Sequence, residues 1–320
     1  MAERRSRPAT RRPSSPSRNR PAVRGSLVAV RELRLRLDEL YRTFDHPDAA
    51  SDPVHIVRRY TAPDDREVVG FCAAALAFGR VASVLNSIES LLAAMGPHPA
   101  AFVRSFDARR DRAAIDPLVH RWIRGRDLVA LMLILRRMLL ESGTIERFFV
   151  SGDDPTADDV GAALEAFSTR ALETDLAAAY GSAVVPNGVS GTQARPGVCY
   201  FFPRPSAGSA CKRLNLFLRW MVRRDANDLG TWTSVSPSRL IIPLDTHVIR
   251  LGRCLRLTRY SSPNWKMAAD ITAALRRVSA DDPVSYDFSL CHVGMMGACG
   301  YGRAQRDRQC PLKGICRPPK

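Results

Sequence analysis

Long apolar runs are missing from this sequence. A helix needs roughly 18 to 20 consecutive apolar residues to cross a bilayer. The longest apolar stretch, residues 128–140, is interrupted by Arg136 and Arg137. We therefore expect no membrane span and a cytoplasmic protein.

Strand-like alternation of apolar and polar residues is also scarce, and only residues 198–202 and 239–242 suggest extended segments. No internal repeat, Walker loop or nuclease-like cluster of acidic residues is present. Apolar residues instead recur with helical spacing in residues 26–41, 63–79, 84–95, 128–140 and 158–180. The sequence predicts an all-α protein with long functional loops.

Acidic residues are nearly absent from residues 1–26, which hold eight arginines and one glutamate. This segment contributes +7 of the net charge of +16, so the remaining +9 lies in residues 27–320. Because it has almost no large apolar side chains to bury, we expect a disordered basic tail. A basic tail on a basic body favours nucleic acid as the partner, with simple solubility as the alternative.

A tight turn containing Gly208, Ser209 and Ala210 precedes one lysine of special interest. Lys212 lies in the first turn of the helix that follows, where the helix dipole opposes a cation. With Arg213 beside it, Lys212 is a candidate amine nucleophile. Taken alone, an ordinary solvated lysine is the better interpretation. The apolar stripe of this helix is Leu214, Phe217, Leu218 and Met221.

Asp245 begins a second candidate helix. The run PLDTHV turns at Pro243 and places Asp245 directly before an apolar stripe. A carboxylate at this position accepts backbone N–H bonds as an N-cap. Capping and catalysis are compatible roles for Asp245.

Together the two segments resemble the helix-hairpin-helix DNA glycosylases, in which a glycine-rich hairpin and a lysine precede Val-Asp-Thr-His. The resemblance implies two helical lobes with a cleft between them, one spanning about residues 63–235 and the other residues 27–62 with 236–300. It implies double-stranded DNA as the partner of a monomer, associated with the nucleoid. The implied catalytic pair is Lys212, which attacks the deoxyribose C1′, and Asp245, which activates it. Implied DNA contacts are Gly208, Ser209, Ala210, Arg204 and Arg213, and implied supporting residues are Thr246 and His247.

The chain resembles more closely an uncharacterised family of bacterial and archaeal proteins, through SACKRLNLFLRWMVR, IIPLDTHV and DPVSYDF. This resemblance covers most of residues 30–300 and adds no tested activity. Ala210 replaces the second hairpin glycine, and the spacing of 33 residues from Lys212 to Asp245 resembles archaeal 8-oxoguanine glycosylases. Three functions stay open. They are a base-excision glycosylase with lyase activity on a damaged base such as an oxidised purine, a DNA- or RNA-binding protein without catalysis, and a metalloprotein that depends on its C-terminal cysteines.

Other side chains near the turn have two interpretations each. Several of the arginines around the turn are expected to face solvent or phosphate. These arginines are Arg204, Arg213, Arg219, Arg223 and Arg224. The aromatic residues could stack on an extruded base, although core packing is the more common role. These residues are Phe201, Phe202, Trp220 and Trp232.

Four of the eight cysteines lie in residues 291–320, at Cys291, Cys299, Cys310 and Cys316. The run CPLKGIC resembles the end of the iron–sulfur loop of endonuclease III, which implies a [4Fe–4S] cluster in this C-terminal loop. Cys291 or His292 would have to complete the four ligands. The same thiols could hold zinc, or remain reduced and free of metal.

Overall fold

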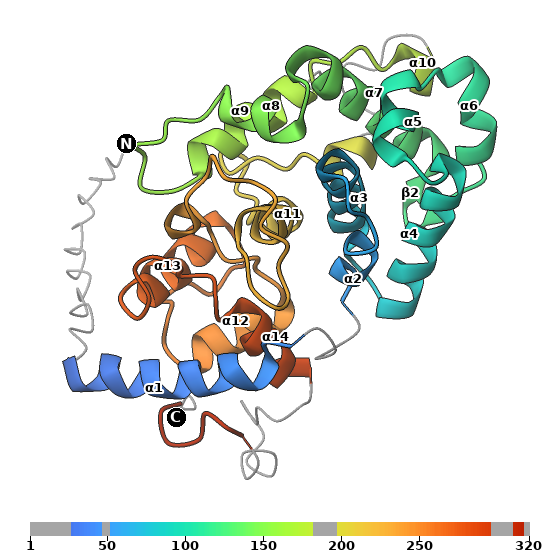
Figure 1. The fold of residues 1–320 in the computed structure, drawn as a ribbon. Helices are drawn as coiled ribbons and strands as arrows, with labels where there is room; N and C mark the ends of the chain where they lie inside the picture. Colours follow the sequence, from blue (N-terminus) through green and yellow to red (C-terminus); the bar gives the residue numbers. More distant parts are fainter. Residues whose placement is uncertain (1–26, 47–51, 182–196, 296–309, 317–320) are drawn as a thin grey trace, which may run out of the picture.

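The computed structural model describes residues 27–46, 52–181, 197–295 and 310–316. Fourteen α-helices dominate this part of the chain, and its sheet is a two-stranded antiparallel hairpin (Figure 1). The all-α prediction is confirmed. None of the helices in these ranges has the length and apolar composition to span a bilayer. The predicted basic tail, residues 1–26, and Cys299 lie outside the described residues.

Residues 54–180 form a group of helices around α3 (Pro63–Leu76) and α7 (Gly125–Ser142). Pro63 and two acidic residues begin α3, as expected at the positive end of a helix. The α7 helix is buried over most of its surface, which explains its nearly uniform apolar composition. The elements up to residue 180 are α1 (Leu27–Phe44), α2 (Val54–Val57), α3 (Pro63–Leu76), α4 (Val81–Met95), α5 (Pro99–Ser105), α6 (Ala108–Ile115), β1 (Val119–His120), β2 (Ile123–Arg124), α7 (Gly125–Ser142), α8 (Ile145–Val150), α9 (Gly161–Ala171) and α10 (Ala177–Tyr180).

The second half places α11 near the centre of the molecule. This helix packs against α3, while α12 packs against α14, and α14 also contacts α1 (Figure 1). The first and last helices of the described chain therefore lie side by side. The remaining elements are the 3-10 helix η1 (Gly197–Tyr200), α11 (Lys212–Val222), the 3-10 helix η2 (Pro237–Arg239), α12 (Thr246–Cys254), α13 (Trp265–Arg276) and α14 (Asp287–Met295). The predicted lobe boundaries stay a prediction.

Two local predictions were wrong. Residues 197–200 form η1 instead of an extended segment. Of the second predicted extended segment only Arg239 belongs to η2, and Leu240 after it is extended. The helix expected over residues 158–180 is interrupted, because α9 ends at Ala171 and α10 begins at Ala177. The Asp175 carboxylate stabilises the start of α10 by accepting from the Ala177 N–H at 2.9 Å. Periodicity alone could not detect this break, since the spacing of apolar residues continues across it.

The hairpin of β1 and β2 turns tightly between His120 and Ile123, which pair across it. Arg121 adopts a left-handed φ of 55° in this turn, at a position where two-residue hairpins usually hold glycine. At its base, Gly125 lies directly on the backbone of Asp116. A Cβ atom at position 125 would stand 2.3 Å from both the Asp116 Cα and its carbonyl oxygen.

We expect Gly125→Ala to destabilise the fold by roughly 1 to 3 kcal/mol, because backbone atoms cannot move aside as a flexible side chain can. The measurement is the free energy of unfolding from urea titration. Gly70→Ala is the matched control. That glycine is also buried in a helix, but its nearest neighbour is the movable Met221 methyl group, so a smaller loss is expected. Equal stability of Gly125→Ala and wild type would disprove the close contact.

Candidate active site

The chain enters α11 through a tight turn that positions Lys212. Gly208 has a φ of 77°, and Cys211 has a left-handed φ of 49° just before the helix. The buried Cys211 thiol lies 3.4 Å from the Pro203 carbonyl oxygen, which holds this unusual backbone in place. Lys212 is the first residue of α11, as predicted. The element before the turn is η1 and not an α-helix, so the described residues lack the first helix of a helix-hairpin-helix unit.

The Lys212 ammonium lies between the ends of two helices. Its Nζ donates to the Ala77 carbonyl oxygen at 3.4 Å, directly after the end of α3. The carbonyl end of a helix attracts a cation, whereas the N-terminus of α11 repels it. The hydrogen bond to Ala77 holds the Lys212 side chain against the end of α3. Because Lys212 is only half-buried, a ligand can still contact it.

Asp245 is the N-cap of α12, as predicted. Its Oδ1 accepts from the Val248 N–H at 2.7 Å. Its Oδ2 accepts from the Cys291 thiol of α14 at 3.1 Å. Thr246 is exposed beside it, and His247 packs against Gly294, where a Cβ atom would lie 2.5 Å from the His247 Cβ. Gly294 thus allows α12 and α14 to approach closely, which brings the Cys291 thiol to Asp245 Oδ2.

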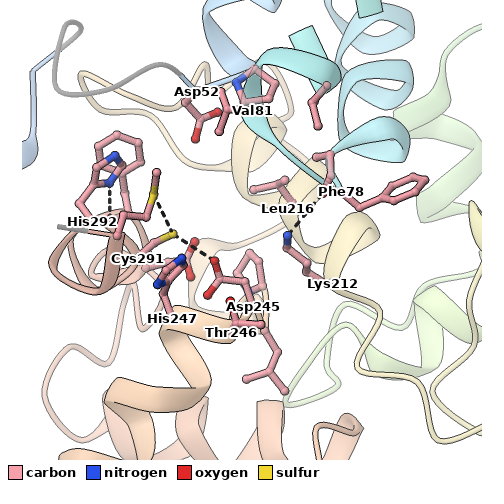
Figure 2. A pocket seen from close by; sticks show the side chains of 18 of the residues that line it. Asp52, Phe78, Val81, Lys212, Leu216, Asp245, Thr246, His247, Cys291 and His292 are labelled. Atoms are coloured by element: carbon pink, nitrogen blue, oxygen red, sulfur yellow. Dashed lines mark hydrogen bonds between the residues drawn. The ribbon is translucent and has the colours of Figure 1, made fainter. Parts of the chain in front are cut away.

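Lys212 and Asp245 line one cavity of about 530 Å³ (Figure 2). The Lys212 side chain points toward the end of α3, and the Asp245 carboxylate points toward Cys291 (Figure 2). The two residues therefore share a cavity but engage different partners. The cavity is enclosed by the residues before α2, the α3–α4 connection, and helices α11, α12 and α14.

Several cavity residues were not among the predicted site residues. Leu216 and Arg219 lie one and two helical turns beyond Lys212, on the same face of α11. This spacing was available in the sequence as a signal. Asp287 and Asp52 also line the cavity, and only folding brings them there.

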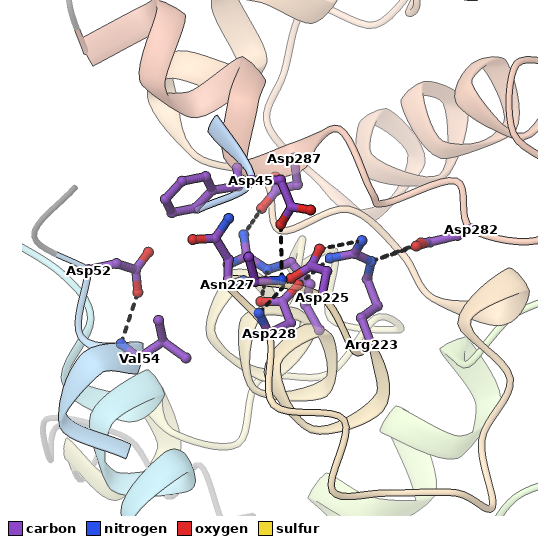
Figure 3. Close-up of polar contacts among 12 residues, drawn as sticks. Asp45, Asp52, Val54, Arg223, Asp225, Asn227, Asp228, Asp282 and Asp287 are labelled. Atoms are coloured by element: carbon purple, nitrogen blue, oxygen red, sulfur yellow. Dashed lines mark hydrogen bonds and ion pairs between the residues drawn. The ribbon is translucent and has the colours of Figure 1, made fainter. Parts of the chain in front are cut away.

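Arg219 and Asp287 form the polar inner wall of the cavity. Arg219 is 3% exposed, and it pairs with Asp287 of α14 and with Asp228, whose Oδ1 lies 3.1 Å from its Nε. Asp228 also pairs with Arg223, which binds Asp225 at 2.8 Å and Asp282 at 2.8 Å (Figure 3). The expectation of solvent-facing arginines is therefore wrong for Arg219 and Arg223. Buried carboxylates neutralise them, because an unpaired buried charge is costly.

Three polar atoms of cavity-lining residues have no hydrogen-bond partner among the described residues. They are the Arg219 Nη2, the Asp287 Oδ1 and the His292 Nε2. Burial raises the pKa of Asp287 to about 7, the Arg219 guanidinium opposes this increase, and the charge of Asp245 adds to it. Burial and the carboxylates of Asp245 and Asp287 also raise the pKa of the Cys291 thiol. This wall therefore holds protons near neutral pH.

The predicted DNA-contact residues form two groups, which are the three residues of the turn before α11 and two arginines. Gly208 is exposed, and Ser209 and Ala210 are half-buried in the turn before α11. Arg204 pairs with Glu165 at 3.8 Å. The Arg213 guanidinium donates to the Tyr200 carbonyl oxygen and lies 5.1 Å from the centre of the Phe78 ring, and burial lowers its pKa to about 10. Both arginines thus have partners within the protein.

The four aromatic residues near the turn belong to the core. Phe201, Phe202 and Trp220 are fully buried, and Trp232 is nearly so. Core packing, and not stacking on a base, is their role.

The described cysteines do not gather as metal ligands. Cys291 donates to Asp245, while Cys310 is buried in the C-terminal segment and Cys316 is half-buried. Among the described residues no three histidine, cysteine or acidic side chains are arranged to hold a metal ion. Cys299 lies outside these ranges, so the [4Fe–4S] cluster stays a prediction, and no chemistry is assigned to it.

Residues 52–296 match the family model described as a protein of unknown function, DUF2400. The match spans well over half of the chain, which therefore belongs to this family. The predicted membership of an uncharacterised family is confirmed. No curated protein and no solved structure matches the chain.

The raised pKa of Asp287 predicts a pH dependence of stability. The folded chain holds this proton up to about pH 7, whereas an ordinary aspartate releases it near pH 4. Its stabilising contribution is complete below about pH 4 and is lost as the pH rises to about 7. Asp287→Asn cannot titrate, so its free energy of unfolding should fall less than that of wild type across this range.

The measurement is urea unfolding of both proteins at several pH values. Asp281→Asn is the control, because Asp281 is exposed and its loss should leave the wild-type slope unchanged. Parallel profiles for wild type and Asp287→Asn would show that Asp287 holds no such proton.

Proposed function

We propose that this protein is a DNA base-excision glycosylase with lyase activity, in which the Lys212 amine attacks C1′ of a damaged nucleotide. The observation that carries the proposal is the position of Lys212 and Asp245, which begin two different helices and line one cavity. The resemblance of their sequence segments to the helix-hairpin-helix glycosylases supplies the reaction class.

The cavity suits an extruded nucleotide. Its volume of about 530 Å³ falls within the range of small-molecule sites, roughly 300 to 1,000 Å³. Apolar side chains such as Phe78, Val81 and Leu216 line it together with the charged groups. A base inside a duplex cannot reach such a site, so the damaged nucleotide must leave the helical stack. Double-stranded DNA is the proposed partner, and oxidised purines are the proposed class of lesion.

Lys212 is the nucleophile in this proposal. Its neutral amine forms a bond to C1′ as the bond from C1′ to the base breaks, and the base leaves with that electron pair and takes up a proton. The C1′–O4′ bond then opens, O4′ gains a proton, and a Schiff base joins Lys212 to the sugar. Removal of a C2′ proton expels the 3′ phosphate and cleaves the strand.

Asp245 is the residue proposed to accept the ammonium proton and to stabilise positive charge on the sugar. Support comes from its fixed carboxylate, which the Val248 N–H and the Cys291 thiol hold from two sides. A preorganised charge stabilises a transition state without having to reorient during the reaction.

The net charge agrees with a polyanionic substrate. Residues 27–320 carry +9 even without the basic tail, so DNA binding should weaken as salt increases. The wider proposal is a monomer that acts on the nucleoid in the cytoplasm. Its alternative is a protein that binds DNA or RNA on the same scaffold without catalysis.

Borohydride trapping on DNA with an abasic site or 8-oxoguanine tests the chemistry, because hydride reduces the Schiff base to a stable amine. We expect a covalent adduct with wild type, none with Lys212→Ala, and roughly 100-fold less with Asp245→Asn. Lys266→Ala is the matched control. Lys266 also lies in the first turn of a helix but is exposed on α13, and the chain has only four lysines.

Each variant should first give the wild-type melting temperature within a few degrees. An undiminished adduct with folded Lys212→Ala would refute the proposed nucleophile. Absence of an adduct with wild type, together with salt-sensitive DNA binding, would favour the non-catalytic alternative.

A further inference from the structure

Three aromatic side chains meet at the surface beside the cavity. Trp122 comes from the turn of the β1–β2 hairpin, Phe78 follows α3, and Tyr200 ends η1. The Trp122 ring lies 4.8 Å from the Phe78 ring and 5.7 Å from the Tyr200 ring, measured between centroids. Trp122 is 47% exposed and Tyr200 is 40% exposed. We call these three residues the aromatic surface.

Exposure of this group contrasts with the other aromatic side chains of the region. Trp220 and Trp232 are buried in the core. Two adjacent exposed aromatic rings, Trp122 and Tyr200, are unusual on a protein surface unless they bind a partner. The left-handed backbone of Arg121 holds Trp122 at the tip of the hairpin, and backbone strain of this kind concentrates at functional positions.

Three exposed arginines lie on the segments that carry Phe78 and Trp122. The Arg121 guanidinium lies 5.2 Å from the centre of the Trp122 ring, and Arg124 donates to the Arg121 carbonyl oxygen at 3.4 Å. Arg80 follows Phe78 by two residues. All three arginines are exposed, and none forms an ion pair with a carboxylate in the described part of the chain. Exposed rings with free arginines suit a ligand that has both a flat base and phosphates.

The aromatic surface adjoins the candidate active site through Phe78. This side chain lines the cavity and also stacks with Trp122. Lys212 donates to the carbonyl oxygen of Ala77, the residue before Phe78. A nucleotide on the aromatic surface would therefore neighbour one inside the cavity.

His120 fixes the hairpin in this position. One ring nitrogen lies 2.9 Å from the Ser87 hydroxyl on α4, and the other lies 2.9 Å from the Phe78 carbonyl oxygen. The His120 ring also packs edge-on against Phe78, with centroids 4.5 Å apart. Because the hairpin is already held in place, binding costs little ordering entropy.

We infer that Trp122 and Tyr200, with Phe78 packed against Trp122, stack on an unpaired nucleobase of a DNA strand, next to the nucleotide that enters the cavity. The placement of this base next to a nucleotide in the cavity rests on the proposed function. The stacking interaction is independent of that function, because it requires only an unpaired base and the phosphates beside it. Arg80, Arg121 and Arg124 contact those phosphates.

Binding of a labelled ten-residue single-stranded oligothymidylate tests this inference by fluorescence anisotropy. Loss of one stacked base should weaken binding about 10-fold to 100-fold in Trp122→Ala, with a smaller loss in Trp122→Tyr. Val119→Ala is the matched control. Val119 is 56% exposed on the same hairpin, and its loss should leave the affinity unchanged.

Two further measurements separate stacking from charge. An oligomer of the same length without bases should bind wild type and Trp122→Ala equally, because only the phosphates remain. Oligothymidylate should also quench the tryptophan fluorescence of wild type more than that of Trp122→Phe, because Trp220 and Trp232 are buried and the half-buried Trp265 packs against Gly161 of α9.

Wild-type affinity of Trp122→Ala for oligothymidylate would overturn the inference. A change in oligomeric state of Trp122→Ala by sedimentation, without a change in DNA binding, would instead identify the aromatic surface as a contact between copies. Lys266→Ala, which removes an exposed lysine of α13, should bind oligothymidylate like wild type. If oligothymidylate quenches the tryptophan fluorescence of wild type while borohydride traps no covalent adduct, that result would refute the proposed chemistry and still support the stacking inference.

Discussion

The buried guanidinium of Arg219 constrains the arrangement of the helices around the cavity. A charge removed from water must be matched by an opposite charge, and Arg219 finds one in Asp287 of α14 and another in Asp228 after α11. The adjacent Arg223 extends the same network to Asp225 and Asp282. Residues separated by more than 60 positions are therefore held together, and the wall between α11 and α14 has one stable arrangement.

That arrangement decides what the cavity contains. Because α14 is held against α11, the Cys291 thiol reaches Asp245 at the start of α12. Lys212 projects into the cavity from the start of α11, and the carbonyl oxygen of Ala77 at the end of α3 accepts from its ammonium. The cavity thus combines a half-buried amine, a capped carboxylate and a carboxyl group with a raised pKa. These are the groups that the proposed glycosylase reaction would use for attack on the sugar and for the proton transfers that follow it.

The arginines that are available to a ligand differ from those that the sequence predicted. Arg204 and Arg213 bind groups within the protein, so they are less available to phosphate than their positions suggested. The free arginines lie instead around the aromatic surface, on the β1–β2 hairpin and before α4. Under the proposed function, contacts to the DNA strand would therefore come from the β1–β2 hairpin more than from the turn before α11.

The sequence by itself determined the helical class, the start of α11 at Lys212 and the N-cap role of Asp245, because these depend on local periodicity and capping. It also identified the family through short runs of residues. Tertiary structure alone decided that Arg219 and Asp287 meet, that Cys291 faces Asp245 and that Trp122 stays exposed while Trp220 is buried. A local pattern cannot encode these outcomes, since burial and pairing depend on which distant segments pack together.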